Sequence, residues 1–153
     1  MLTTRRTLLL TLLASAALPR PVRAARNDSP SAGLELAGLY DDALDPAPFL
    51  VSEKYDGVRG HWDGTTLRFR SGRAVAAPGW FTARLPRVPL DGELWLARGR
   101  FDELSGIVRR RVPVDPDWQR VRYMVFDLPG ADGPFAARER RLREIVAANA
   151  WDA

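Results

Sequence analysis

The pair Asp63-Gly64 stands between two runs of strand-forming residues, and it limits the possible folds more than any other short stretch of the chain. Residues 58–62 precede the pair and residues 66–70 follow it. Asp-Gly between two such runs is a strong signal for a tight turn between antiparallel strands. The sequence therefore predicts a β-hairpin here.

Other segments predict further strands and two helices around this hairpin. Residues 90–96 and 121–128 are rich in β-branched, aromatic and leucine residues between Pro, Asp and Gly, which favours strands. Residues 102–111 and 135–149 have apolar residues at helical spacing, and arginines occupy the opposite face of the second segment. The expected fold class is therefore α+β, with mainly antiparallel sheets and flanking helices.

Lys54 is the only lysine among the 23 basic residues of the chain. It lies in the string Lys54-Tyr55-Asp56-Gly57-Val58-Arg59, and residues 49–53 before it predict a strand that presents Lys54 at its end. Arginine is not a useful nucleophile at neutral pH, whereas a lysine amine can be made one. We interpret Lys54 as a position where an amine is needed.

Three more short motifs follow this string in the chain. They are Arg70-Ser71-Gly72-Arg73, Leu90-Asp91-Gly92-Glu93-Leu94 and Tyr123-Met124-Val125-Phe126-Asp127. In type and order, the four strings resemble the nucleotidyltransferase motifs of ATP-dependent DNA ligases and of the related RNA ligases and mRNA capping enzymes. The phrases VSEKYDGVRG, LDGELW and VRYMVFDLPG resemble in particular the minimal exported bacterial DNA ligases known as ligase E.

This resemblance implies the nucleotidyltransferase fold of ligases and capping enzymes, and it implies roles for individual residues. Lys54 would attack ATP and become AMP-lysine, Asp56 would orient Lys54 or the metal, and Arg59 would assist as the third catalytic residue. The implied nucleotide-binding set is Glu53, Lys54, Arg59, Arg70, Glu93 and Phe126. Within it Glu93 would serve Mg²⁺ and the ribose, and Phe126 would stack on adenine.

The resemblance also implies the partners. The cofactors would be ATP and Mg²⁺, and the substrate would be nicked double-stranded DNA, in repair, replication or recombination. Arg73, Arg109 and Arg110 are candidates for contact with DNA phosphates. We expect a monomer without stable membrane insertion.

The first 24 residues resemble a secretory signal. They contain Arg5-Arg6, an apolar run over residues 7–18 and a cleavage site after Ala24, and they also match a twin-arginine signal. Export to the periplasm is therefore expected, with residues 25–33 as a flexible lead-in. These 24 residues hold the whole formal charge of +4, so net charge does not indicate DNA binding. The absence of cysteine excludes a disulfide scaffold.

Residues 34–153 are expected to form a partial adenylation domain. The later Glu-Gly and Lys-x-Lys motifs of the ligases, and their OB domain, do not follow in this sequence. We therefore expect the chain alone to seal nicks poorly or not at all. Two alternatives remain open, namely an RNA ligase or capping-type nucleotidyltransferase, and a non-catalytic remnant that binds nucleotide or DNA.

Overall fold

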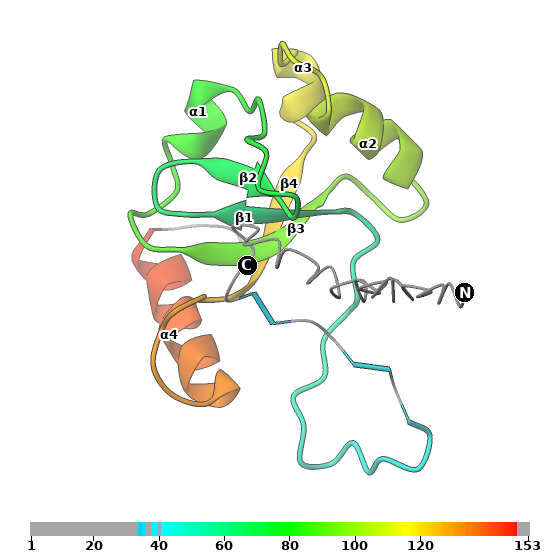
Figure 1. The fold of residues 1–153 in the computed structure, drawn as a ribbon, viewed down its shortest axis with the longest axis vertical. Helices are drawn as coiled ribbons and strands as arrows, with labels where there is room; N and C mark the ends of the chain where they lie inside the picture. The colour runs from blue at the N-terminus through cyan, green and yellow to red at the C-terminus, as the bar shows by residue number, and fades with distance from the viewer. Residues whose placement is uncertain (1–33, 36–37, 40, 150–153) are drawn as a thin grey trace, which may run out of the picture.

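The described part of the chain forms one antiparallel sheet of four strands, with helices above and below it (Figure 1). The structure, a computed structural model, describes residues 34–35, 38–39 and 41–149. The expected signal segment 1–24 and lead-in 25–33 lie outside these residues. In chain order the elements are β1 (Val58–Trp62), β2 (Leu67–Phe69), α1 (Gly79–Thr82), β3 (Leu90–Trp95), α2 (Phe101–Val108), α3 (Asp115–Trp118), β4 (Arg122–Asp127) and α4 (Phe135–Ala148).

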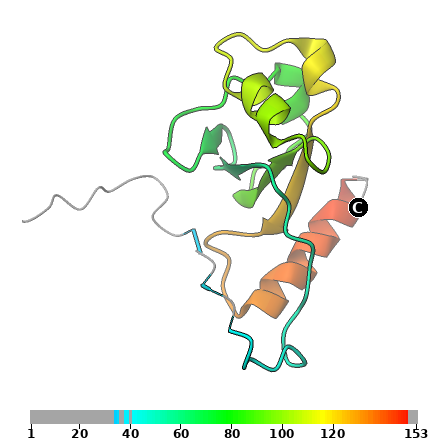
Figure 2. The same cartoon turned by 90° about the vertical axis from the view of Figure 1, so that its right-hand side faces the viewer.

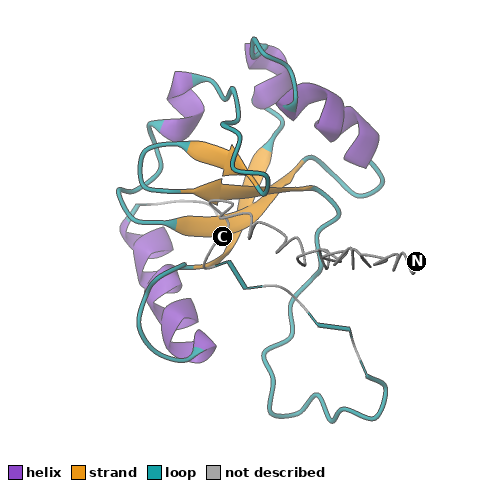
Figure 3. Cartoon of the chain, in the orientation of Figure 1, coloured by secondary structure: helices purple, strands orange, loops and turns teal. Residues whose placement is uncertain are grey.

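The sheet has the strand order β2-β1-β3-β4, and all its neighbouring strands are antiparallel. The expected α+β class is therefore confirmed. Figure 3 shows that the helices lie outside this sheet and that a long loop precedes its first strand. The register pairs Arg59 of β1 with Glu93 of β3, and Glu93 with Met124 of β4. Side chains of directly paired residues project from the same face of a sheet, so this register gathers side chains from three strands.

The hydrophobic core lies between the sheet and the helices. Leu90 and Leu94 of β3, Leu104 of α2 and Trp118 of α3 have no exposed surface. Helix α4 packs beside β4, on the other side of the molecule from α2 (Figure 2), and Leu142 is its buried contact. Among the described residues, no helix combines the length and the apolar character that crossing a bilayer requires.

The predicted hairpin forms, and Asp63 organises its turn. The Asp63 Oδ1 atom accepts hydrogen bonds from the Thr65 hydroxyl at 2.7 Å and from the Thr66 backbone N–H at 2.8 Å. The Asp63 Oδ2 atom accepts one from Arg68 Nε at 2.9 Å. Gly64 follows with a φ of 96°, a left-handed conformation that glycine adopts without a steric cost. The turn therefore uses both residues of the Asp-Gly signal.

Replacing Asp63 by asparagine is expected to weaken this hairpin in a pH-dependent way. Desolvation acts to raise the pKa of Asp63, but the hydrogen bonds from Thr65, Arg68 and Thr66 outweigh it and hold the pKa below its ordinary value. A carboxyl with a lowered folded-state pKa stabilises the fold at neutral pH, and this contribution is lost as the pH falls below about 4. We expect the variant to be about 1 kcal/mol less stable at pH 7, and the difference to shrink towards pH 3 in urea unfolding. A difference that stays constant over this pH range would contradict the assignment.

One predicted strand is absent. Residues 49–53 form no strand; they belong to the loop before β1 (Figure 3), so Lys54 is not held at the end of a strand. The side chains of Phe49, Leu50 and Val51 are exposed by 55%, 61% and 83%. Strand propensity acts through pairing and packing, and the two edges of β1 are already taken by β2 and β3. This apolar run therefore has the composition of a strand but no partner strand among the described residues.

Candidate active site

Two of the predicted site residues, Arg59 and Glu93, lie on one face of the sheet together with Asp91. Arg59 pairs in register with Glu93, and Asp91 pairs with His61 two positions along the same strands. Because side chains alternate along a strand, the Arg59, Asp91 and Glu93 side chains project from the face opposite to that of the buried Leu90 and Leu94. The first and third motifs of the sequence thus meet on one surface.

Gly57 fastens the Lys54 loop to strand β3. A Cβ atom on Gly57 would lie 2.2 Å from the Leu94 carbonyl oxygen and 2.9 Å from Cγ of Glu93. Only a residue without a side chain allows the loop backbone to come so close to β3. A second contact between the loop and β3 is aromatic: the rings of Tyr55 and Trp95 meet edge to face with their centroids 5.3 Å apart. Lys54 is therefore placed by contacts of the residues that follow it.

An open cavity of about 520 Å³ surrounds Lys54. Its walls include Glu53, Lys54, Tyr55, Asp56, Trp95 and Arg98. Cavities of roughly 300–1,000 Å³ are usual for small-molecule sites, so this volume fits a nucleotide. Two of these lining residues form an ion pair, since Arg98 Nη2 lies 2.8 Å from Glu53 Oε1. Trp95 and Arg98 lie outside the four motifs, so the sequence did not assign either of them to the nucleotide site.

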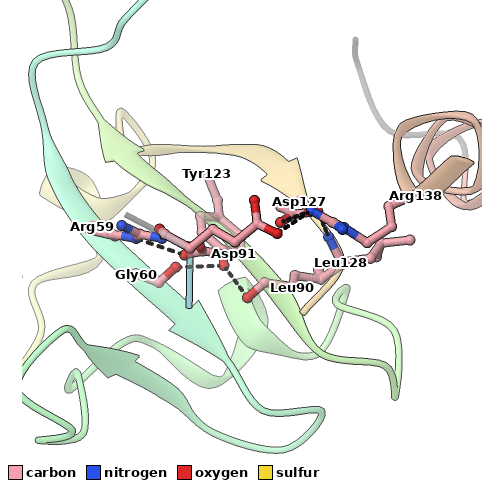
Figure 4. Close-up of polar contacts among 9 residues, drawn as sticks. Arg59, Gly60, Leu90, Asp91, Tyr123, Asp127, Leu128 and Arg138 are labelled. Atoms are coloured by element: carbon pink, nitrogen blue, oxygen red, sulfur yellow. Dashed lines mark hydrogen bonds and ion pairs between the residues drawn. The ribbon is translucent and has the colours of Figure 1, made fainter. Parts of the chain in front are cut away.

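Arg59 is held by the buried carboxylate of Asp91 (Figure 4). Its Nε donates to Asp91 Oδ1 at 3.1 Å, and its Nη2 donates to Asp91 Oδ2 at 2.5 Å. The same Nη2 donates to the Glu35 backbone carbonyl at 2.8 Å. The hydrogen bond to Asp91 raises the pKa of the Arg59 guanidinium, which therefore stays charged. The guanidinium carbon lies 5.7 Å from the centroid of the Phe126 ring, so the structure brings Phe126 to Arg59.

Glu93 is partly buried beside these charges. Burial raises its pKa, and the Gly57 backbone N–H and the Arg59 charge act in the opposite direction. The negative charges of Asp91 and Asp56 add to the upward shift. Positive charge brought close to Glu93 would therefore be stabilised.

The site also fits a metal ion that is partly held by substrate. Among the described residues, no three Asp, Glu or His side chains are placed to hold a metal ion by themselves. Mg²⁺ usually takes only one or two carboxylates and completes its shell with phosphate oxygens and water. The charge of Asp56 acts to raise the pKa of Glu93, as a neighbouring anion does. Glu93 and Asp56 are therefore the candidate carboxylates for such a metal ion.

A second pair of opposite charges adjoins the first. Arg138 of α4 donates to Asp127 Oδ1 at 2.8 Å (Figure 4). It also donates to Glu35 Oε1 at 3.0 Å. Glu35 thus contacts Arg59 through its backbone carbonyl and Arg138 through its side chain. The aspartate of the fourth motif therefore anchors α4. Neither Glu35 nor Arg138 carried a signal in the sequence, because such contacts depend on the tertiary fold.

The arginines proposed to contact DNA are arranged differently from one another. The guanidinium carbons of Arg73 and Arg109 lie 4.8 Å and 5.9 Å from the centroid of the Phe69 ring. The fold thus brings together two cations that are 36 residues apart in the sequence. Arg110 instead pairs with Asp117 at 2.5 Å. Arg70 is exposed just beyond the end of β2.

Comparisons with known proteins agree with this arrangement of fold and motifs. No model of a known protein family matches the chain. Over 95 residues the chain is 36% identical to a DNA ligase of Haemophilus influenzae, a match that covers 62% of this chain and 35% of that protein. The chain is therefore similar in sequence to a DNA ligase, and the resemblance predicted from the motifs is confirmed. The DNA ligase interpretation is favoured over the RNA ligase and capping enzyme alternatives.

A solved structure makes the likeness more particular. The chain is similar to a structure from an analysis of Lig E DNA ligases and their binding of DNA with a minimal scaffold, at 43% identity and a TM-score of 0.70. This match covers 76% of the present chain and 46% of the other. A structure named Pmar-Lig_PreS3, at 20% identity and a TM-score of 0.50 over 63% of this chain and 27% of its own, shares the fold. The chain is thus Lig E-like and spans between about a third and a half of the length of these two DNA ligase relatives.

Proposed function

We propose that this chain carries the nucleotide-transfer site of an ATP-dependent DNA ligase that seals nicks in double-stranded DNA. The observation that carries the proposal is that the Lys54 motif and the motif on β3, which are separate in the sequence, lie next to each other in the fold. Gly57 packs the Lys54 loop against β3, and Arg59 and Glu93 stand side by side on the adjoining face of the sheet. Likeness to DNA ligases over most of the chain supports the same conclusion.

The proposed chemistry begins at Lys54. Its amine, once neutral, attacks the α-phosphorus of ATP. A phosphorus–nitrogen bond forms, the bond to the β-phosphate oxygen breaks, pyrophosphate leaves, and the proton of the amine passes to solvent. An oxygen of the 5′ phosphate at a nick then attacks the phosphorus of this AMP, the phosphorus–nitrogen bond breaks, and the Lys54 amine is freed. The 3′ hydroxyl next attacks the phosphorus of the 5′ phosphate, AMP leaves, the hydroxyl proton passes to solvent, and the strand is closed.

The surrounding residues have separate roles in this proposal. Glu93 and Asp56 would hold Mg²⁺, which when bound would neutralise charge on the phosphates. Phe126 has 39% of its surface exposed beside Arg59, so its ring is free to stack on a base. Arg70 contacts phosphate.

DNA phosphates would meet the arginines around Phe69. Arg73 and Arg109 have no acidic partner among the described residues, whereas Arg110 has Asp117. We therefore place the DNA backbone at Arg73 and Arg109, with Arg110 as a weaker contact. We also propose that the protein acts in the periplasm as a monomer.

The test is transfer of AMP to the protein. The full chain is incubated with Mg²⁺ and ATP labelled at the α-phosphate, and the product is mapped by mass spectrometry. We expect the mass of AMP on Lys54 and none on Lys54→Arg, which keeps the charge but removes the nucleophile. Arg143→Gln, a change in an exposed ion pair on α4, is the matched control and should label normally. Absence of label on the unaltered chain would favour the non-catalytic alternative.

A further inference from the structure

Arg98 differs from the other cations near Lys54 because its guanidinium is exposed and only weakly held. Its side chain is 81% exposed, and its one ion pair, to Glu53 at 2.8 Å, involves a carboxylate that is itself 44% exposed. An exposed pair of this kind contributes only about 0–1 kcal/mol. Another anion can therefore replace the Glu53 carboxylate at little cost.

Arg59, which its motif assigns to nucleotide binding, is in the opposite situation. Two of its nitrogens donate to Asp91, which is 1% exposed, and one of these also donates to the Glu35 carbonyl. A guanidinium has five N–H donors, and only those on Nη1 have no partner among the described residues. Arg59 can thus stabilise charge at the site, but it cannot turn to follow a phosphate group.

The local structure presents Arg98 to the cavity. Arg98 lies in the turn between β3 and α2, where the Arg100 backbone N–H donates to the Ala97 carbonyl at 3.2 Å. Three residues earlier, Trp95 packs edge to face on Tyr55 and fixes the wall of the cavity next to Lys54. Arg98 and Lys54 therefore line the same open space from two different loops.

We propose that Arg98 is the phosphate-binding group of the cavity around Lys54, and that Glu53 holds Arg98 in place until a phosphate replaces the carboxylate. The proposal extends the proposed function, on which it rests for the choice of ligand. The phosphate belongs to the polyphosphate tail of a nucleotide or to the 5′ phosphate of a DNA end. In both cases a planar guanidinium offers two parallel hydrogen bonds to phosphate oxygens.

The test uses two substitutions that break the same ion pair from its two sides. Inorganic tripolyphosphate is titrated calorimetrically into the full chain and into Arg98→Gln and Glu53→Gln. Loss of a charged hydrogen-bonding partner should weaken binding about tenfold in Arg98→Gln. Loss of the competing carboxylate should strengthen binding by about threefold in Glu53→Gln. A purely structural ion pair would shift both variants in the same direction.

Further variants and probes complete the test. Arg98→Lys keeps the charge without the planar fork and should bind with intermediate affinity, while Arg143→Gln on α4 should bind like the unaltered chain. A parallel titration compares a nicked duplex carrying a 5′ phosphate with the same duplex carrying a 5′ hydroxyl. Opposite effects of the Arg98 and Glu53 substitutions with tripolyphosphate assign the site to the nucleotide tail. The same pattern confined to the 5′-phosphorylated duplex assigns it to the DNA end.

Several results would overturn the proposal. These are shifts of both variants in one direction, affinities unchanged by either substitution, and an unaltered chain that binds neither probe. The tripolyphosphate titration does not require transfer of AMP, so it is independent of the labelling of Lys54. Arg98-dependent binding without labelling would uphold the phosphate site and remove the proposed function. Labelling without Arg98-dependent binding would do the reverse.

Discussion

Asp91→Asn should lower the free energy of unfolding by about 3 kcal/mol, the lower end of the range for breaking a buried ion pair by removing one partner. Asp91 is 1% exposed and accepts two hydrogen bonds from Arg59. The substitution keeps the size of the side chain, but it leaves the Arg59 charge without its anion. Arg59 retains 21% exposure of its side chain, which gives it some access to water and limits the loss. Urea unfolding followed by circular dichroism measures the change.

An exposed ion pair provides the matched control for Asp91. Glu139→Gln removes the acidic partner of Arg143 on the surface of α4, where the Arg143 side chain is 79% exposed. Its expected cost is below about 1 kcal/mol. If Asp91→Asn cost no more than Glu139→Gln, the pair between Asp91 and Arg59 would not be an anchor of the fold.

Gly57→Ala should disable the site while leaving most of the fold in place. The new Cβ atom would stand 2.2 Å from the Leu94 carbonyl oxygen, which belongs to the backbone of a central strand and cannot yield. The Lys54 loop must therefore move away from β3. Overpacking of this kind costs about 1–3 kcal/mol, and a displacement of about 1 Å at a reacting group can slow a reaction about a hundredfold. We expect that loss in the rate at which AMP is transferred to Lys54.

Gly106→Ala is the matched control for this substitution. Gly106 lies inside α2, and a Cβ atom there would have nothing within 4 Å. Alanine is the better helix former by about 1 kcal/mol, so this variant should be as stable as the unaltered chain or more stable. Equal rates of AMP transfer by Gly57→Ala and Gly106→Ala would show that the approach of the loop to β3 is not needed.

Sequence patterns predicted most of the regular structure, because those elements carry local signals. The Asp-Gly turn and the alternating strands require no knowledge of distant residues, and the two longer helices show their apolar faces directly. The strand expected at residues 49–53 was wrong, because composition does not show whether a partner strand is present. The four-residue helices α1 and α3 were not predicted, since each is too short to show a helical period.

For the site, too, the sequence predicted residues that carry a local signal and missed those that depend on the tertiary fold. Lys54, Arg59 and Glu93 could be proposed because they stand in short motifs with recognisable order. The hydrogen bonds of Glu35 with Arg59 and Arg138 join residues far apart in the sequence, and no local sequence pattern predicts them. Arg98 is one arginine among many in the sequence, and only its place beside Lys54 in the cavity makes it a candidate.

The exposure of Lys54 in its open cavity has a practical consequence, because the chain has no other lysine. Reagents that acylate or methylate amines can modify only this side chain and the terminal amine of the protein. Isotope-labelled methyl groups introduced by reductive methylation would thus give a single side-chain resonance, located at the site itself. That resonance would report directly on what enters the cavity, without any engineered probe.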